Sequence, residues 1–274
     1  MTRLAPIRAL RAIPSLAALA VLAALAWTLL SPTPGVAGGM VTYTQGSTRV
    51  SGYLAIPQTE GPHPAVIVIQ EWWGLNDWVK EQADLLTREG YLAFAPDLYR
   101  GRVATTSEDA HQYMSGLSDD DAMAILRASS EFLRSRYDVH AHAIGTIGFC
   151  MGGKYSIRLA AADPGIRAAV MYYGAPITDA ATIKQIRAAV LGNFGGEDKG
   201  PTPGQVNAFR TALQKAGKRV DFKIYPKAGH AFANVNNPWG GYREEAAKDA
   251  WARTLAFFKK ELKEAPAPKA PDKK

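Results

Sequence analysis

Short apolar runs alternate with helix-like patterns along the middle of the chain. Residues 65–69 read Ala-Val-Ile-Val-Ile, and such a continuous β-branched run is typical of a strand that is covered on both faces. Apolar residues at helical spacing follow it, between a capping residue at Asn76 or Asp77 and a terminating Gly90. The same alternation continues to residue 262. Further strands are expected at residues 91–95, 144–149, 167–173, 189–194 and 220–225, and further helices at residues 152–162, 202–216 and 244–262 and from residue 119 onward.

This alternation predicts the fold class. Strands separated by helices require crossover connections, which produce a mostly parallel sheet with helices on both faces, an α/β fold. Residues 41–44 and 49–56 predict a hairpin that opens the domain. Ligands of such sheets bind beyond the carboxyl ends of the strands. A functional site is therefore expected in the loops that follow residues 69, 149, 194 and 225.

The first 37 residues have a character of their own. Three arginines and no acid precede an apolar run at residues 13–30, and small residues follow at 35–37, which is the layout of a secretory signal peptide. The run of 18 residues is also just long enough to cross a bilayer, so an uncleaved N-terminal membrane anchor is the alternative. A buried core helix fits less well, because the run is apolar all round. We expect an exported domain, periplasmic or secreted, or one held at the membrane through residues 13–30.

Composition narrows the function classes. The formal net charge is +7 and falls to +4 without residues 1–37, which is too small and too dispersed for a nucleic-acid-binding protein. The single cysteine excludes an internal disulfide and, with five scattered histidines, a cysteine-based zinc site. A chelating His140-Ala-His142 pair has no carboxylate cluster near it, so no metal and no cofactor are expected. Residues 38–263 are long enough for one domain, and the Pro/Ala/Lys tail at 264–274 is expected to be disordered.

The sole cysteine lies at a predicted turn from strand to helix. Such a turn strains the backbone at its apex, and glycines two residues to either side, Gly148 and Gly152, let the turn close. Cys150 then stands at a helix N-terminus, where free N–H groups and the helix dipole stabilise a thiolate or a developing oxyanion. The chain thus has Gly-x-Cys-x-Gly in the place of the Gly-x-Ser-x-Gly that is known from hydrolases. Cys150 is either a nucleophile or an inert buried thiol.

A thiol nucleophile requires a base, and the base requires an orienting carboxylate. In this fold the acid and then the histidine follow the nucleophile along the chain. Asp198 follows the strand at 189–194 and His230 the strand at 220–225, so each lies at the right strand end in the right order. Glu197 is the chief rival of Asp198. The pattern predicts a catalytic triad of Cys150, His230 and Asp198.

Five motifs together resemble one known family. They are Gln70–Asn76, Ala95–Tyr99, Gly148–Gly153, Gly195–Asp198 and Gly229–Phe232, and the closing residues 250–258 are similar too. Taken in order over about residues 40–262, they resemble the dienelactone hydrolase family. The resemblance implies an α/β-hydrolase fold and a hydrolase of ester or lactone bonds that works through a covalent thioester. We expect a monomer without a cofactor that acts on a small-molecule ester or lactone.

The resemblance also implies roles for residues around the thiol. Glu71 would help to generate the thiolate when substrate binds. The backbone N–H groups of Met151 and Trp72 would form the oxyanion hole. Tyr99 and an arginine just after it, Arg100 or Arg102, would face the substrate.

One position departs from the family's best-known members, which hold a substrate carboxylate with two arginines. In this chain Asn234 takes the place of the second arginine, and a neutral amide cannot replace a bidentate guanidinium. The sequence therefore predicts hydrolysis of esters or lactones in general rather than of dienelactone in particular. Trp72, Trp73, Trp78 and Trp239 are candidates for lining a broader apolar pocket around the substrate.

Two other function classes fit parts of the sequence. Residues 148–154 also match Gly-x-x-x-x-Gly-Lys, the phosphate-binding loop, but Tyr155 stands where a Ser or Thr must reach magnesium, and an exported protein would lack ATP. Alternatively, a catalytically inactive binding protein could keep the hydrolase fold. The presence of every triad residue argues for the enzyme.

Overall fold

The computed structural model describes residues 37–264. Its strands are β1 (Ala37–Gln45), β2 (Thr48–Ile56), β3 (His63–Ile69), β4 (Leu92–Pro96), β5 (Val139–Phe149), β6 (Ile166–Tyr172), β7 (Ala189–Gly195) and β8 (Val220–Tyr225). Its helices are α2 (Asp77–Arg88), α3 (Ser107–Ser115), α4 (Asp119–Ser135), α5 (Met151–Ala162), α6 (Ala180–Gln185), α7 (Pro203–Lys215) and α8 (Glu244–Phe258), followed by a π-helical segment η1 (Lys259–Glu264).

The predicted signal or anchor segment and the predicted tail lie outside the described residues, except for Ala37 and Glu264. Both remain predictions. Within residues 37–264, no helix has the length and apolar character needed to cross a membrane.

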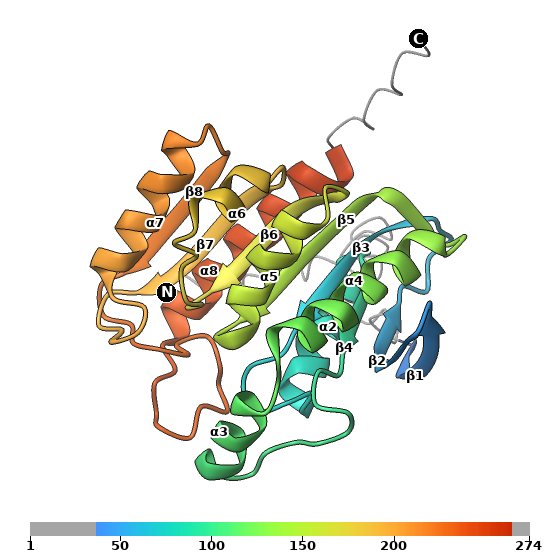
Figure 1. Cartoon of the computed structure of the whole chain (residues 1–274), viewed down its shortest axis with the longest axis horizontal. Coiled ribbons are helices and arrows are strands. Elements are labelled where there is room, and N and C mark those ends of the chain that lie inside the picture. Colours follow the sequence, from blue (N-terminus) through green and yellow to red (C-terminus); the bar gives the residue numbers. More distant parts are fainter. Residues whose placement is uncertain (1–36, 265–274) are drawn as a thin grey trace, which may run out of the picture. The chain divides into compact units, whose positions relative to one another are not determined.

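The strands of the described region form one sheet in the order β1-β2-β4-β3-β5-β6-β7-β8 (Figure 1). β1 and β2 form the expected antiparallel hairpin, and β2 joins β4 in antiparallel fashion. All neighbouring pairs from β3 to β8 are parallel. The predicted mostly parallel α/β sheet is confirmed, and the loops after β3, β5, β7 and β8 leave the sheet at one edge.

Two hydrophobic cores lie on the two faces of this sheet. The first contains Ala65, Ile67 and Ile69 of β3 together with side chains of α4, α5 and α7. The second contains Val66 and Val68 of the same strand together with side chains of α2 and α8. Because successive strand residues point to opposite faces, the continuous apolar run supplies both cores at once. Helices accordingly cover both faces (Figure 1).

The structure differs from the sequence expectation in a few elements. α3 buries only Ala110, so it has no apolar stripe of helical period to recognise. α6 has only six residues. The last helix ends at Phe258 instead of residue 262, because the chain continues as the π-helical segment. β5 starts earlier than predicted, so His140 and His142 lie within it, and residues 37–264 hold no cluster of three candidate metal ligands.

Candidate active site

The turn from β5 to α5 places Cys150 at its apex. The backbone of Cys150 has φ 53° and ψ −116°, and a positive φ is uncommon for residues other than glycine. A Cβ on Gly148 would collide with the backbone of Gly152, and a Cβ on Gly152 would collide with the carbonyl oxygen of Ile69. The two glycines therefore permit the tight turn that the sequence predicts. The turn holds the thiol at the N-terminus of α5.

The loops after β7 and β8 bring an acid and a histidine to this thiol. Nε2 of His230 lies 3.1 Å from Sγ of Cys150, and Nδ1 of His230 lies 2.9 Å from Oδ2 of Asp198. The Asp198 carboxylate is buried, and its second oxygen accepts a hydrogen bond of 2.8 Å from the N–H of Gly200. Glu197 is exposed to solvent. The structure thus joins Asp198, and not its rival, to the histidine.

The charged form of His230 is favoured at this position. Burial by itself would lower the pKa of His230, but its hydrogen bonds with Asp198 and Cys150 raise the pKa from 6.5 to about 10. An imidazole held in this way can accept a proton from the thiol and keep it beside the resulting thiolate. The buried carboxylate of Asp198 fixes the orientation of the ring.

Replacing His230 by glutamine is expected to flatten the dependence of stability on pH. Because the folded pKa is raised, the charged imidazole stabilises the fold fully below pH 6.5, and this stabilisation is lost as the pH rises toward about 10. The side chain is 33% exposed, so solvent screening limits the expected loss to about 1–2 kcal/mol of unfolding free energy. Urea unfolding at a series of pH values measures it.

His142 offers a matched control for this experiment, since it is an exposed histidine on β5. The His142→Gln variant should keep the wild-type slope of stability against pH. If His230→Gln also kept that slope, the charged pairing of His230 with its neighbours would be contradicted.

Glu71 lies at the start of the loop after β3, and it is buried. Its Oε2 accepts a hydrogen bond of 2.7 Å from Nδ2 of Asn234, whereas its Oε1 is buried with no hydrogen-bond partner among the described residues. Burial raises the pKa of the Glu71 carboxyl, and the Asn234 hydrogen bond opposes that rise only in part. The carboxyl therefore tends to keep its proton.

A pocket of about 280 Å³ lies beside the thiol. Large apolar side chains make up most of its wall. The lining residues are Glu71, Trp72, Trp73, Met114, Cys150, His230, Ala231 and Trp239. The three indole rings contact one another, with ring centroids 5.1 to 5.8 Å apart. The predicted apolar pocket thus includes three of the four tryptophans, while Trp78 packs edge-on against Phe149 in the core.

Comparison with known proteins places this chain in a family. A sequence model of the dienelactone hydrolase family matches residues 50–262. The chain belongs to the dienelactone hydrolase family. It is 31% identical to a "putative carboxymethylenebutenolidase" of Methylorubrum extorquens over 85% of this chain and 84% of the relative, and 33% identical to one of Escherichia coli over 86% and 92%. The crystal structure of a "putative dienelactone hydrolase" from Klebsiella pneumoniae is 30% identical to this chain and superposes with a TM-score of 0.75. The match covers 82% of this chain and 98% of the Klebsiella chain.

Membership in the dienelactone hydrolase family indicates the general class of reaction that the chain catalyses. The family comprises carboxylic ester hydrolases, so the chain is a hydrolase of ester or lactone bonds. The fold agrees with this assignment, since the Klebsiella structure shares the α/β-hydrolase architecture.

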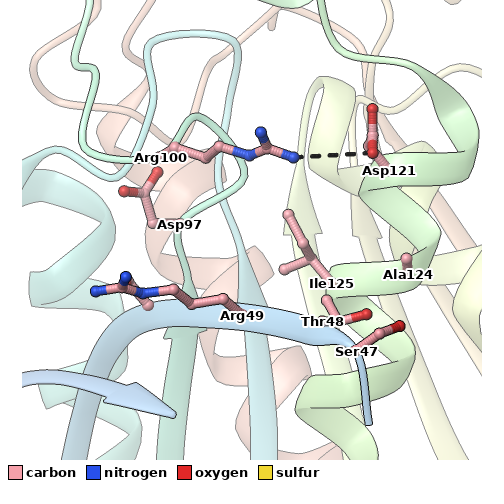
Figure 2. Close-up of a pocket in the computed structure, with 9 residues that line it drawn as sticks. Ser47, Thr48, Arg49, Asp97, Arg100, Asp121, Ala124 and Ile125 are labelled. Carbon is pink, nitrogen blue, oxygen red and sulfur yellow. Dashed lines mark ion pairs between the residues drawn. The ribbon is translucent and has the colours of Figure 1, made fainter. Parts of the chain in front are cut away.

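Arg100 and Arg102, the two candidates for the one arginine expected to face the substrate, contact other groups. Arg100 lines a separate hollow of about 590 Å³ with Arg49 and Asp97, and its guanidinium points toward Asp121 at 3.9 Å (Figure 2). Arg102 lies over the ring of Tyr113, 4.6 Å from the ring centroid. Neither lines the pocket beside Cys150.

Tyr99 is buried in the core that includes α4 and α5. Its hydroxyl donates a hydrogen bond of 3.5 Å to Sδ of Met151. Tyr99 therefore contacts the residue next to the thiol but does not line the pocket itself. Its structural effect on the site is to support the first turn of α5.

The two N–H groups expected to form the oxyanion hole are free to serve it. Met151 is the first residue of α5, where an N–H has no acceptor within its own helix. Trp72 follows Glu71 in the loop after β3. Neither N–H donates a hydrogen bond to another residue of the described chain. Both remain available to an oxyanion on a substrate bound at Cys150.

Two contributions to the site were missed from the sequence. Met114 comes from α3, a helix that its polar sequence did not reveal. Asn234 was expected to face the substrate, but it is buried and hydrogen-bonded to Glu71. No local pattern signals a hydrogen bond between residues so far apart in the chain.

Proposed function

We propose that this enzyme cleaves esters or lactones with Cys150 as its nucleophile, through a thioester intermediate. One observation carries the proposal: Sγ of Cys150 lies 3.1 Å from Nε2 of His230, whose other ring nitrogen lies 2.9 Å from the buried carboxylate of Asp198. Nucleophile, base and orienting acid in this arrangement are what covalent acyl transfer requires. The pocket beside them supplies room for a small substrate.

In the first step, the thiol proton passes to Nε2 of His230 and the thiolate attacks the carbonyl carbon. The carbonyl electrons move to the oxygen, which accepts hydrogen bonds from the N–H groups of Met151 and Trp72. When the tetrahedral intermediate collapses, the bond to the alcohol oxygen breaks and His230 returns its proton to that oxygen. Cys150 is left as a thioester of the acid.

In the second step, a water molecule attacks the thioester while His230 accepts one of its protons. Collapse of this second tetrahedral intermediate breaks the bond between carbon and Sγ and releases the carboxylic acid, and the proton held by His230 returns to the thiolate. Asp198 stabilises the imidazolium in both steps. The raised pKa of His230 favours this charged form of the ring.

Glu71 lines the same pocket. A carboxylate at this position would oppose a thiolate at Cys150, because both groups line one small pocket. Burial raises the pKa of Glu71, which favours its protonated form and lessens that opposition.

Trapping the acyl-enzyme tests this function. Rapid mixing with p-nitrophenyl acetate followed by acid quenching should yield protein heavier by one acetyl group, and peptide mapping should place the acetyl on Cys150. Neutral hydroxylamine should remove it, as expected of a thioester. An acetyl group on another residue, or an early burst of nitrophenol without any labelled protein, would contradict the mechanism.

A further inference from the structure

We propose that the substrates of this site are esters or lactones that carry no charge near the scissile bond. The inference rests on the proposed function, since it concerns the pocket beside the proposed nucleophile. It goes further because it names the chemical class that this pocket selects. Three features of the pocket carry it: its apolar walls, a lining without lysine or arginine among the described residues, and the packing of its indole rings.

The walls of the pocket come from three separate parts of the chain. Trp72 and Trp73 lie in the loop after β3, Met114 lies on α3, and Trp239 lies in the loop between β8 and α8. All four side chains are large and apolar. A volume of about 280 Å³ is at the small end of ligand pockets, which range from about 300 to 1,000 Å³. The pocket therefore suits a compact apolar group next to the ester.

No lysine or arginine among the described residues lines this pocket. Its ionisable groups are Glu71, Cys150 and His230. The charge of His230 is already paired, through contacts with Asp198 and Cys150. A substrate carboxylate would lose its hydration here without gaining a cation, which is unfavourable.

Neither of the two candidate arginines, Arg100 and Arg102, supplies a cation to this pocket. Arg100 extends toward Asp121 in its own hollow (Figure 2), and Arg102 lies over Tyr113. Asn234 stands where the family's best-known members have an arginine, and its amide donates a hydrogen bond to Glu71. An anionic substrate bound beside the thiol would therefore contact neither of the two guanidinium groups that hold a substrate carboxylate in the family's best-known members.

The tryptophans are also packed too closely to hold a cationic group between their rings. A cation is held over the open faces of aromatic rings, within about 6 Å of their centroids. Here the rings of Trp72, Trp73 and Trp239 pack on one another at centroid distances of 5.1 to 5.8 Å, so they form a wall instead of an open cage. The partly buried apolar wall favours an uncharged apolar group of the substrate.

The charge preference is tested with three p-nitrophenyl esters of similar shape. Their acyl groups differ in the charge at the free end. The isocaproyl group is neutral, the succinyl group is anionic, and the acyl group of β-alanine betaine is cationic. Each kcat/KM is divided by the uncatalysed rate of the same ester. The isocaproyl ester should exceed both charged esters by about 30-fold or more, because neither charge is compensated in the pocket.

An arginine introduced at the pocket should shift this preference. Trp239 is 58% exposed, so Trp239→Arg can be accommodated and places a cation in the lining. The ratio of succinyl to isocaproyl activity should rise about tenfold or more. Val235 is the matched control, since it is also 58% exposed and belongs to the same loop but does not line the pocket. Val235→Arg should leave the ratio at the wild-type value.

The outcomes separate this inference from the function on which it rests. Equal or faster hydrolysis of the succinyl ester by the wild type would overturn the proposed class and leave the cysteine mechanism standing. Preference for the betaine ester would overturn it in favour of a cation site. An equal shift in both arginine variants would show that the pocket does not set the preference. If no ester reacts faster than with Cys150→Ala, the proposed function itself fails.

Discussion

Replacing Cys150 by alanine is expected to lower kcat/KM for a neutral aryl ester by at least about a thousandfold. The nucleophile, the base and the acid act as a unit, so loss of the nucleophile removes the covalent route entirely. Cys150 is the only cysteine of the chain, and no second thiol can substitute for it. Steady-state kinetics of p-nitrophenyl isocaproate, with circular dichroism to verify folding, measure the effect.

Cys150→Ser provides the sharper comparison. It keeps a nucleophilic atom within reach of His230, but a hydroxyl is far harder to ionise than a thiol. We expect most of the activity to be lost while the fold and substrate binding persist. Activity of Cys150→Ala within a few-fold of the wild type would show that another group performs the hydrolysis. It would also favour a binding protein or a different site on the same fold.

Replacing Gly148 by alanine is expected to lower the free energy of unfolding by at least about 3 kcal/mol. A Cβ at this position meets the backbone of Gly152 and Gly153, which cannot move aside as the end of a flexible side chain could. The turn that carries Cys150 would have to open, so activity should fall together with stability. For a domain of this size the melting temperature should drop by about 10 °C. Differential scanning calorimetry and the ester assay measure both.

Gly204 is the matched control for this substitution. It lies in the first turn of α7, where an added Cβ meets only Thr202, at an ordinary distance. Alanine there should be neutral or should stabilise the helix by about 0.5–1 kcal/mol, because glycine is the poorer helix former. If both variants kept the wild-type melting temperature, close packing at the turn would not be what positions Cys150.

Much of the fold could be predicted because its strongest signals are local. The run at residues 65–69 is apolar at every position, and in the structure it feeds the cores on both faces of the sheet. Capping residues located helix starts equally well, as Asn76 shows by accepting a hydrogen bond from the N–H of Val79. A helix without an apolar stripe lacks this local signal, and α3 was therefore not predicted.

The candidate triad could be predicted because chain order and strand topology are linked. The parallel strands β5, β7 and β8 end at one edge of the sheet, so residues that follow them meet there. Cys150, Asp198 and His230 follow those strands in turn. The choice between Asp198 and Glu197 needed the structure, because neighbouring loop residues point in different directions.

The sequence by itself determined the fold class, the family and the set of groups that can perform acyl transfer, since these depend on periodicity, turn residues and order along the chain. Only the tertiary structure decided the environment of those groups. It turned Arg100 and Arg102 away from the thiol, joined Asn234 to Glu71 and brought Met114 and Trp239 to the pocket wall. The physical reason is that side-chain direction and burial arise from contacts between loops distant in the chain, which no local pattern of residues records.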